Sequence, residues 1–243
     1  MGTPPDGHGA SDHGEVAPVA DARDHVLARI ADACARVGRE PASVAMVAVS
    51  KTVPAVRLRE AVAAGLTILG ENRVQEAEAK AAEVPGATWH LVGPLQSNKA
   101  RRALDTFAVI ESVHSIGLAV RLDGLVRSAV GGDPYPVLLQ VNVDRDPAKS
   151  GFVADELEAA IESLDANDCL EYRGLMTVGR LTDHPEAARP GFLALRTLSE
   201  RLRSRWPRLG GELSMGMSDD FEIAIEEGAT VVRIGRALFG HRH

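Results

Sequence analysis

The chain has 243 residues and a formal net charge of −7, from 27 basic and 34 acidic side chains. This length suits one large α/β domain or two small ones, and the acidic balance leaves no basic surplus to meet the phosphates of a nucleic acid. Hydrophobic residues make up 45% of the chain but aromatic residues only 4%, so Ala, Val, Leu and Ile must build the core. There is no run of about 18 apolar residues, which predicts no membrane-spanning helix.

The first 20 residues differ from the rest because they are rich in Gly, Pro, Asp and His. Their composition predicts a disordered tail over residues 1–20, followed by one domain over residues 21–243. The tail lacks a basic segment followed by an apolar one, so it does not resemble a secretory signal. Cys34 and Cys169 form no CxxC motif and no metal-ligand spacing, which predicts a reducing compartment and no metal. We therefore expect a cytoplasmic protein.

From residue 21 onward, helix-like and strand-like segments alternate. Helices are predicted over residues 21–37, 54–64, 71–83, 97–104, 115–130, 154–164, 185–206 and 219–227. Strands are predicted over residues 44–49, 66–69, 88–92, 107–110, 136–143, 172–177, 212–214 and 230–234. Eight strands separated by helices are the number that closes a single (β/α)₈ TIM barrel. A doubly wound open sheet is the alternative, and no linker rich in Gly, Pro or Ser divides the domain.

Polar residues cluster where these predicted strands end, which is where barrels carry their chemistry. Lys51 follows the first strand, Asn72 follows the second, and Met176 closes the sixth. A lysine at a barrel mouth can be partly desolvated, and its amine is then free to attack an aldehyde. A lysine that simply reaches solvent from a strand end is the alternative interpretation.

Glycine-bearing turns follow the seventh and eighth predicted strands, at Gly216 and at Gly235 beside Arg236. Barrels frequently hold a phosphate between these two turns, where backbone N–H groups can converge. Ser218 or Asp219 could also cap the next helix. Taken together, the two turns favour a phosphorylated ligand.

Three charged or titratable side chains lie within or beside apolar strand segments. Arg233 sits inside the last strand and therefore needs a partner, for which a barrel carboxylate is one candidate. His90, in the third strand, is expected to be a satisfied core residue. Glu71 is expected to open a helix, where a carboxylate suits the positive helix terminus.

Several motifs in colinear order resemble the YggS/PROSC family of pyridoxal 5′-phosphate (PLP) homeostasis proteins over about residues 21–240. The longest are Val47-Ala48-Val49-Ser50-Lys51-Thr52, Gly70-Glu71-Asn72-Arg73-Val74-Gln75-Glu76, Trp89-His90-Leu91-Val92-Gly93-Pro94-Leu95-Gln96-Ser97-Asn98-Lys99 and Ser214-Met215-Gly216-Met217-Ser218-Asp219-Asp220-Phe221. The shorter ones are Lys149-Ser150-Gly151-Phe152, Gly174-Leu175-Met176-Thr177, Val232-Arg233-Ile234-Gly235 and Leu238-Phe239-Gly240.

This resemblance implies the barrel of alanine racemase, a fold-type III PLP protein, with Lys51 as the Schiff-base lysine. It places Ser214 and the backbone at Met215, Gly235 and Arg236 on the phosphate. It places Arg233 at the pyridine nitrogen, Asn72 near the ring, and Met176 in the cofactor site. Position 236 is often a small hydroxyl residue in the family and is Arg here, so a side-chain hydroxyl contact to phosphate is absent.

We expect a non-enzymatic PLP binder that buffers the cofactor or delivers it to apo PLP-dependent enzymes, as a monomer or weak homodimer. An arginine at the pyridine nitrogen does not readily give up a proton, so the ring is a poor electron sink. Racemases with this barrel add a β-rich domain that supplies a tyrosine, whereas this chain stops after the eighth strand and its tyrosines are Tyr135 and Tyr172. A PLP-dependent racemase of low activity, or a phosphate-binding barrel enzyme without PLP, are the alternatives.

Overall fold

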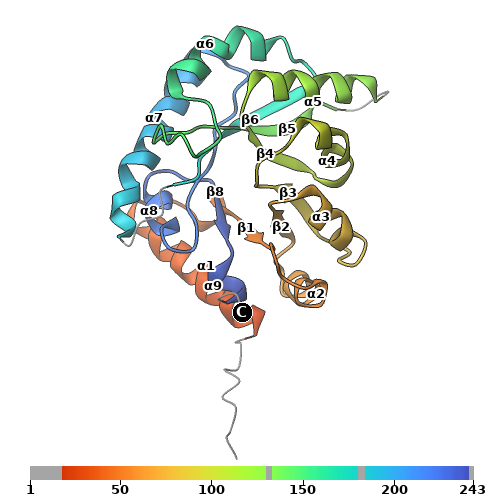
Figure 1. Cartoon of the computed structure of the whole chain (residues 1–243). Helices are drawn as coiled ribbons and strands as arrows, with labels where there is room; N and C mark the ends of the chain where they lie inside the picture. The colour runs from red at the N-terminus through yellow and green to blue at the C-terminus, as the bar shows by residue number, and fades with distance from the viewer. Residues whose placement is uncertain (1–17, 130–132, 180–183, 241–243) are drawn as a thin grey trace, which may run out of the picture.

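The computed structural model describes residues 18–129, 133–179 and 184–240. Within them, eight parallel strands form a closed barrel in the order β1 to β8, with helices around its outside (Figure 1). The barrel closes because β8 pairs with β1, where Arg233 lies opposite Val47. The predicted TIM barrel is confirmed and the open-sheet alternative is excluded.

The strands are short and made largely of Val, Leu and Ile, which suits a parallel sheet buried on both faces. Their bounds are β1 Ala45–Val49, β2 Ile68–Glu71, β3 Thr88–Leu91, β4 Val109–Val113, β5 Tyr135–Gln140, β6 Leu170–Met176, β7 Glu212–Ser214 and β8 Val231–Ile234. Two strands lie further along the chain than predicted. β2 extends to Glu71, and β4 extends to Val113, because Glu71 and Glu111 both find hydrogen-bonding partners where they lie.

The helices follow the predicted alternation. Their bounds are α1 Val19–Arg36, α2 Ala55–Ala63, α3 Val74–Ala81, α4 Ala100–Thr106, α5 Ile116–Ser128, α6 Ala154–Asp165, α7 Arg189–Arg205, α8 Phe221–Glu226 and α9 Arg236–Phe239, with short 3₁₀ turns at Pro41–Ser43, Ser97–Lys99 and Pro185–Ala188. Helix α9 was not predicted, because its four residues are too few to show the periodicity of a helix. None of the helices in these ranges is long and apolar enough to cross a membrane.

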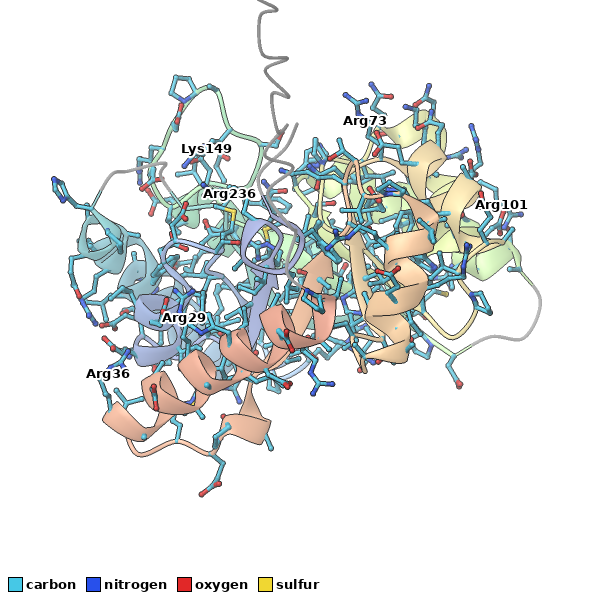
Figure 2. The ribbon with its side chains drawn as sticks, turned by 90° about the horizontal axis from the view of Figure 1, so that it is seen from below. Arg29, Arg36, Arg73, Arg101, Lys149 and Arg236 are labelled. Carbon is cyan, nitrogen blue, oxygen red and sulfur yellow. The ribbon has the colours of Figure 1, made fainter. Side chains whose placement is uncertain are left out.

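The two ends of the described chain meet on one side of the barrel, where α1 lies beside α8 and α9 (Figure 1). Arg29 and Arg36 project from α1 (Figure 2) and form ion pairs with Glu222 and Glu226 of α8. α1 begins at Val19, whose side chain is buried. This helix therefore begins two residues before the predicted domain boundary at residue 21, and residues 1–17 of the predicted tail lie outside the described residues.

Candidate functional site

The turns that carry Lys51 and Gly235 follow two neighbouring strands, β1 and β8. The backbone N–H of Ser50 donates to the Gly70 carbonyl, 2.8 Å away, and Thr52 then turns the chain with a φ of 65°. A Cβ built on Gly235 would lie 3.5 Å from the carbonyl oxygen of Val49. The turn after β8 therefore packs against the end of β1, two residues before Lys51.

An ion pair between the fully buried Glu71 and the partly buried Lys80 supports the backbone that leads into Lys51. The Lys80 Nζ atom lies 2.5 Å from Glu71 Oε1 and 2.8 Å from the Ser50 carbonyl oxygen. The Ser50 hydroxyl donates to the same Glu71 oxygen over 2.8 Å. The prediction that Glu71 opens a helix is wrong, because Glu71 ends β2, is fully buried and pairs with a cation there. Sequence reasoning did not assign Lys80 to the site.

Asn72 follows β2 and lies on the rim of a groove of about 560 Å³. Its backbone N–H donates to Glu71 Oε2 over 3.2 Å. A Cβ on Gly93 would lie 2.4 Å from the Asn72 carbonyl oxygen, so only glycine permits this close approach. The groove is also lined by Arg73, Gln96, Ser97, Lys99 and His114, and Figure 2 shows Arg73 and Arg101 on the side of the molecule away from Arg29.

The turn after β7 and the start of α9 form a small cradle of donors. The backbone N–H groups of Gly235 and Ala237 both point at Ser218 Oγ, each over 3.3 Å. Gly216 has a φ of 90°, and a Cβ on it would lie 2.5 Å from the Cβ of Ala224. This glycine lets the turn pack closely on α8. Arg236, by contrast, points outward and pairs with Asp219, and both side chains are largely exposed.

Three of the predicted site residues are engaged inside the barrel. The Met215 N–H donates to the Val231 carbonyl over 3.1 Å, and the Ser214 hydroxyl lies 2.6 Å from Glu111 Oε2. The Met176 side chain is fully buried against Val109 and Leu138. Barrel hydrogen bonds use the Met215 N–H and the Ser214 hydroxyl, and the phosphate contacts predicted at these two residues stay predictions. The Ser218 hydroxyl and the Ala237 N–H lie close together nearby. In the sequence, Ser218 was marked by its place in the Ser214–Phe221 motif and as a candidate helix cap.

Arg233 is 4% exposed and finds its partners at the mouth end of the barrel. Its Nη1 atom donates to Ser214 Oγ and its Nη2 atom donates to the Thr177 carbonyl, both over 2.6 Å. Ser214 ends β7 and Thr177 follows β6, so the guanidinium lies at the level where these strands end. Burial lowers the pKa of Arg233, and the charges of Glu111 and Asp220 oppose that shift.

Glu111 is the carboxylate near Arg233 that the sequence did not single out. It is 1% exposed, and its Oε1 atom lies 2.7 Å from His90 Nδ1. Burial alone would raise the pKa of Glu111, but the hydrogen bond with His90 and the charges of His90 and Arg233 hold that pKa below its ordinary value. The sequence feature that could have identified Glu111 is an acidic residue within the largely apolar run Val109-Ile110-Glu111-Ser112-Val113.

Residues 20–243 match the family described as alanine racemase, N-terminal domain. The chain belongs to this family. The resemblance drawn from the sequence motifs is thereby confirmed.

Two relatives of this family member are informative. A protein of Pseudomonas aeruginosa named pyridoxal phosphate homeostasis protein is 46% identical over 220 residues, which cover 89% of this chain and 93% of the relative. The structure of PipY from Synechococcus elongatus with PLP bound is 42% identical, has a TM-score of 0.77, and covers 87% of this chain and 100% of PipY.

An alanine racemase of Clostridium difficile shares the fold alone. It is 16% identical with a TM-score of 0.71, and the match covers 91% of this chain but 57% of the racemase.

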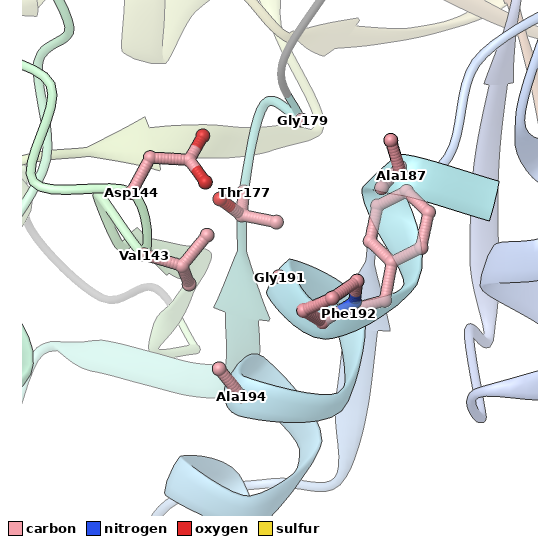
Figure 3. A pocket seen from close by; sticks show the side chains of 10 residues that line it. Val143, Asp144, Thr177, Gly179, Ala187, Gly191, Phe192 and Ala194 are labelled. Carbon is pink, nitrogen blue, oxygen red and sulfur yellow. The ribbon is translucent and has the colours of Figure 1, made fainter. Parts of the chain in front are cut away.

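A second cavity, of about 350 Å³, lies between the loop after β5 and the start of α7 (Figure 3). Its wall is mostly small and apolar, with the Asp144 carboxylate and the Thr177 hydroxyl as polar groups. Lys149 Nζ lies 2.8 Å from Asp144 and also donates to the carbonyls of Val178 and Gly179. This charged pair ties the loop after β5 to the loop after β6.

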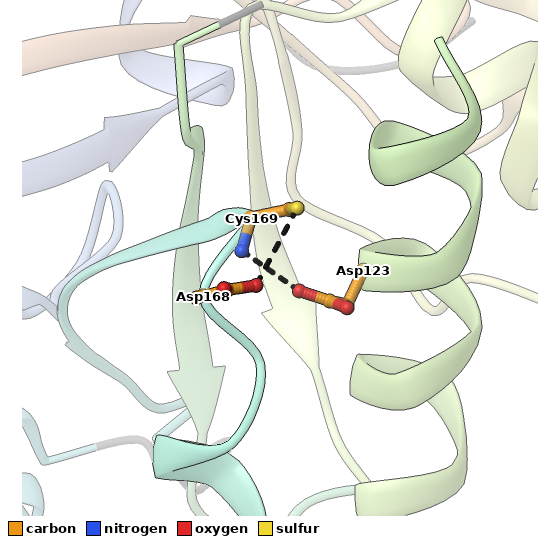
Figure 4. A group of neighbouring side chains, drawn as sticks. All are labelled: Asp123, Asp168 and Cys169. Atoms are coloured by element: carbon orange, nitrogen blue, oxygen red, sulfur yellow. Dashed lines mark hydrogen bonds between the residues drawn. The ribbon is translucent and has the colours of Figure 1, made fainter.

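Asp123, Asp168 and Cys169 gather at the opposite end of the barrel, where β6 begins (Figure 4). Arg127 forms ion pairs with both carboxylates, so a guanidinium already supplies the positive charge in this cluster. Burial and the charge of Asp123 raise the pKa of the Cys169 thiol, which disfavours the thiolate that metals bind. The cluster therefore functions as an ion-pair network between α5 and the start of β6.

Proposed function

We propose that this protein binds PLP as a Schiff base on Lys51 and serves in PLP homeostasis, buffering the cofactor or delivering it to apo PLP-dependent enzymes. One observation carries the proposal: the N–H groups of Gly235 and Ala237 converge on the Ser218 hydroxyl oxygen, in a turn packed against the end of the strand that leads to Lys51. A phosphate oxygen suits such converging donors. The names of the relatives support the same ligand.

The donors in this region fit the cofactor. Ser218 and the backbone of Gly235, Arg236 and Ala237 would hold the phosphate. Arg233 would face the ring nitrogen, and Asn72 would lie near the ring. Ser214 and Met215 would support this arrangement from within the barrel, since their own donors are used there.

When bound, PLP supplies an aldehyde for an amine and a ring that withdraws electrons. Arg233 gives up a proton only with great difficulty, so a ring nitrogen beside it stays unprotonated and withdraws electrons weakly. This favours holding the cofactor over using it in proton-abstraction chemistry.

The positions of the two tyrosines support a non-enzymatic role. Tyr135 begins β5 and Tyr172 lies early in β6, at the end of the barrel opposite Lys51. Their phenols donate to the carbonyls of Phe107 and Leu164, and burial raises the pKa of both. Neither tyrosine of this chain is placed for proton transfer at the mouth.

The site is tested by the absorbance spectrum of the purified protein with PLP, followed by borohydride reduction and mass mapping. We expect visible absorbance from the lysine-bound cofactor and a single modified residue, Lys51. Lys51→Ala should abolish both signals, whereas Lys99→Ala, in the groove beside Asn72, should keep them. Modification of Lys99 or Lys149 in the wild-type protein would show that the site is wrong, and no visible absorbance would favour a phosphate-binding barrel without PLP.

The carrier role is tested by mixing PLP-loaded protein with an apo PLP-dependent enzyme, against an equal concentration of free PLP and with a trap enzyme for leaked cofactor. We expect reactivation of the apo enzyme, and no racemisation of alanine above a Lys51→Ala control. Lys51-dependent racemisation would instead establish a racemase of low activity.

A further inference from the structure

Four side chains form a hydrogen-bonded line through the interior of the barrel. His90 lies on β3, Glu111 on β4, Ser214 on β7 and Arg233 on β8. In a closed barrel of eight strands, β4 and β8 lie on opposite sides, so this line crosses the interior. Its links are 2.7 Å from His90 to Glu111, 2.6 Å from Glu111 to Ser214 and 2.6 Å from Ser214 to Arg233.

The chemistry of the groups determines which way the Ser214 proton points. A guanidinium only donates hydrogen bonds, so Ser214 Oγ accepts from Arg233 Nη1. An ionised carboxylate only accepts, so the single hydroxyl proton of Ser214 is donated to Glu111. Ser214 is fully buried and has no further proton to give a ligand phosphate.

The line also links two opposite charges that are both removed from water. A buried charge is costly unless it is paired and hydrogen-bonded. Arg233 and Glu111 have no direct ion pair within the part of the chain that the structure describes, so the serine hydroxyl joins them. The second anchor of Arg233 is the Thr177 carbonyl, which holds the other Nη atom.

We propose that Glu111 and Ser214 are positioning residues that hold the Arg233 guanidinium in one orientation at the mouth of the barrel, toward the nitrogen of the ligand ring. The identity of that ligand rests on the function proposed above. Ser214 acts on the ring end of the ligand through Arg233 and has no role in holding the phosphate.

The phosphate role and the positioning role of Ser214 can be separated with pyridoxal, which lacks the phosphate. If Ser214 held the phosphate, Ser214→Ala would weaken PLP binding and leave pyridoxal binding unchanged. If Ser214 positions Arg233, the variant weakens both ligands by the same factor. We expect about a tenfold rise in the dissociation constant of each, the effect of one hydrogen bond to a charged group.

Glu111→Gln is the companion variant, because glutamine keeps the shape of the side chain but removes its charge. Glu111→Gln and the Ser214→Ala, Glu111→Gln double variant should each weaken both ligands about as much as Ser214→Ala, since all three break the same line. Each variant should also shift the pH at which the visible band of the lysine-bound cofactor titrates, a signature that loss of stability alone does not produce. Glu227→Gln is the matched control, since this partly buried carboxylate pairs with Arg189 and Arg196 and makes no hydrogen bond to the line.

The experiment requires wild-type protein that shows Lys51-dependent visible absorbance with PLP. If that absorbance is absent, the result counts against the proposed function and not against the positioning role. With that absorbance present, unchanged affinity and an unchanged band titration in Ser214→Ala would overturn the positioning role. If Ser214→Ala loses PLP binding but keeps pyridoxal binding, Ser214 holds the phosphate and the positioning role is overturned. Circular dichroism checks folding, and Ser214→Ala decides the question if Glu111→Gln does not fold.

Discussion

Two buried carboxylates, Glu71 and Glu111, support two parts of the proposed site in different ways. Glu71 is fully buried and pairs directly with the Lys80 ammonium over 2.5 Å. Glu111 is equally buried, but it reaches its nearest arginine only through the Ser214 hydroxyl. The first network holds the backbone before Lys51, and the second holds a side chain, Arg233.

The direct ion pair of Glu71 and the serine-bridged contact of Glu111 should respond differently when the carboxylate is removed. A direct pair leaves an uncompensated buried cation when its carboxylate is removed, which is among the most costly single changes in a protein. In the second network His90, Ser214 and the Thr177 carbonyl share the hydrogen bonds, so removing one charge leaves other partners in place. We expect the Glu71 network to govern folding and the Glu111 network to govern ligand affinity.

The largest effect is expected for Glu71→Ala, which leaves the partly buried Lys80 beside the Ser50 carbonyl without its carboxylate. The free energy of unfolding should fall by about 2–3 kcal/mol, because a largely desolvated charge loses its partner. Urea denaturation measures this change. Glu78→Ala is the control, since its pair with Arg102 is largely exposed and should contribute less than about 1 kcal/mol. Equal losses in the two variants would contradict the distinct role of the Glu71 network.

Glu111→Gln should have a smaller effect on stability, about 1–3 kcal/mol at pH 7, and one that depends on pH. In the folded protein burial opposes ionisation of Glu111, but His90 and Arg233 bring its pKa below the ordinary value of 4.5. The ionised carboxylate therefore contributes stability that is present above about pH 4.5 and is lost as the pH falls through the lower folded pKa.

The difference in unfolding free energy between wild type and Glu111→Gln should accordingly stay constant from about pH 7 to pH 5 and shrink below that. Urea titrations at pH 7, 5 and 4 measure it. A difference that grows on acidification would mean that the folded pKa of Glu111 is raised, and the electrostatic account of this network would fail.

Ser218→Ala tests a residue outside both carboxylate networks. Its hydroxyl faces the N–H groups of Gly235 and Ala237, so its loss should raise the dissociation constant of PLP by about threefold to tenfold. Pyridoxal binding should be unaffected, in contrast to Ser214→Ala. Ser128→Ala, whose exposed hydroxyl donates to the Leu125 carbonyl on α5, is the control and should leave both ligands unchanged. Fluorescence titration with the two ligands decides between these outcomes.

The smallest effect is expected for Arg236→Ala. Arg236 pairs with Asp219 on the surface, and such exposed pairs contribute less than about 1 kcal/mol to stability. Because its exposed side chain is paired with Asp219, PLP affinity should change by less than about twofold. The same titration measures it, and a tenfold loss would show that the side chain turns toward the phosphate when the ligand binds.

The fold could be predicted because its signal is local and repeated. Each strand is an apolar run bounded by a turn, and eight such runs in alternation with helices close a barrel. The four-residue helix α9 was missed because it is shorter than a reliable period. The strand β4 was predicted to end at residue 110 because Glu111 and Ser112 interrupt the apolar run. These two residues belong to the strand because their side chains form buried hydrogen bonds.

The sequence by itself determined the barrel, the family, and the positions of Lys51, Arg233 and the two glycine turns at the strand ends. Only the tertiary structure decided which donors are left for a ligand. Ser214 and Glu111 are 103 positions apart in the chain, and no local pattern relates them. Their contact exists because barrel closure and strand register bring β4, β7 and β8 around one interior, where every buried polar group must find a partner.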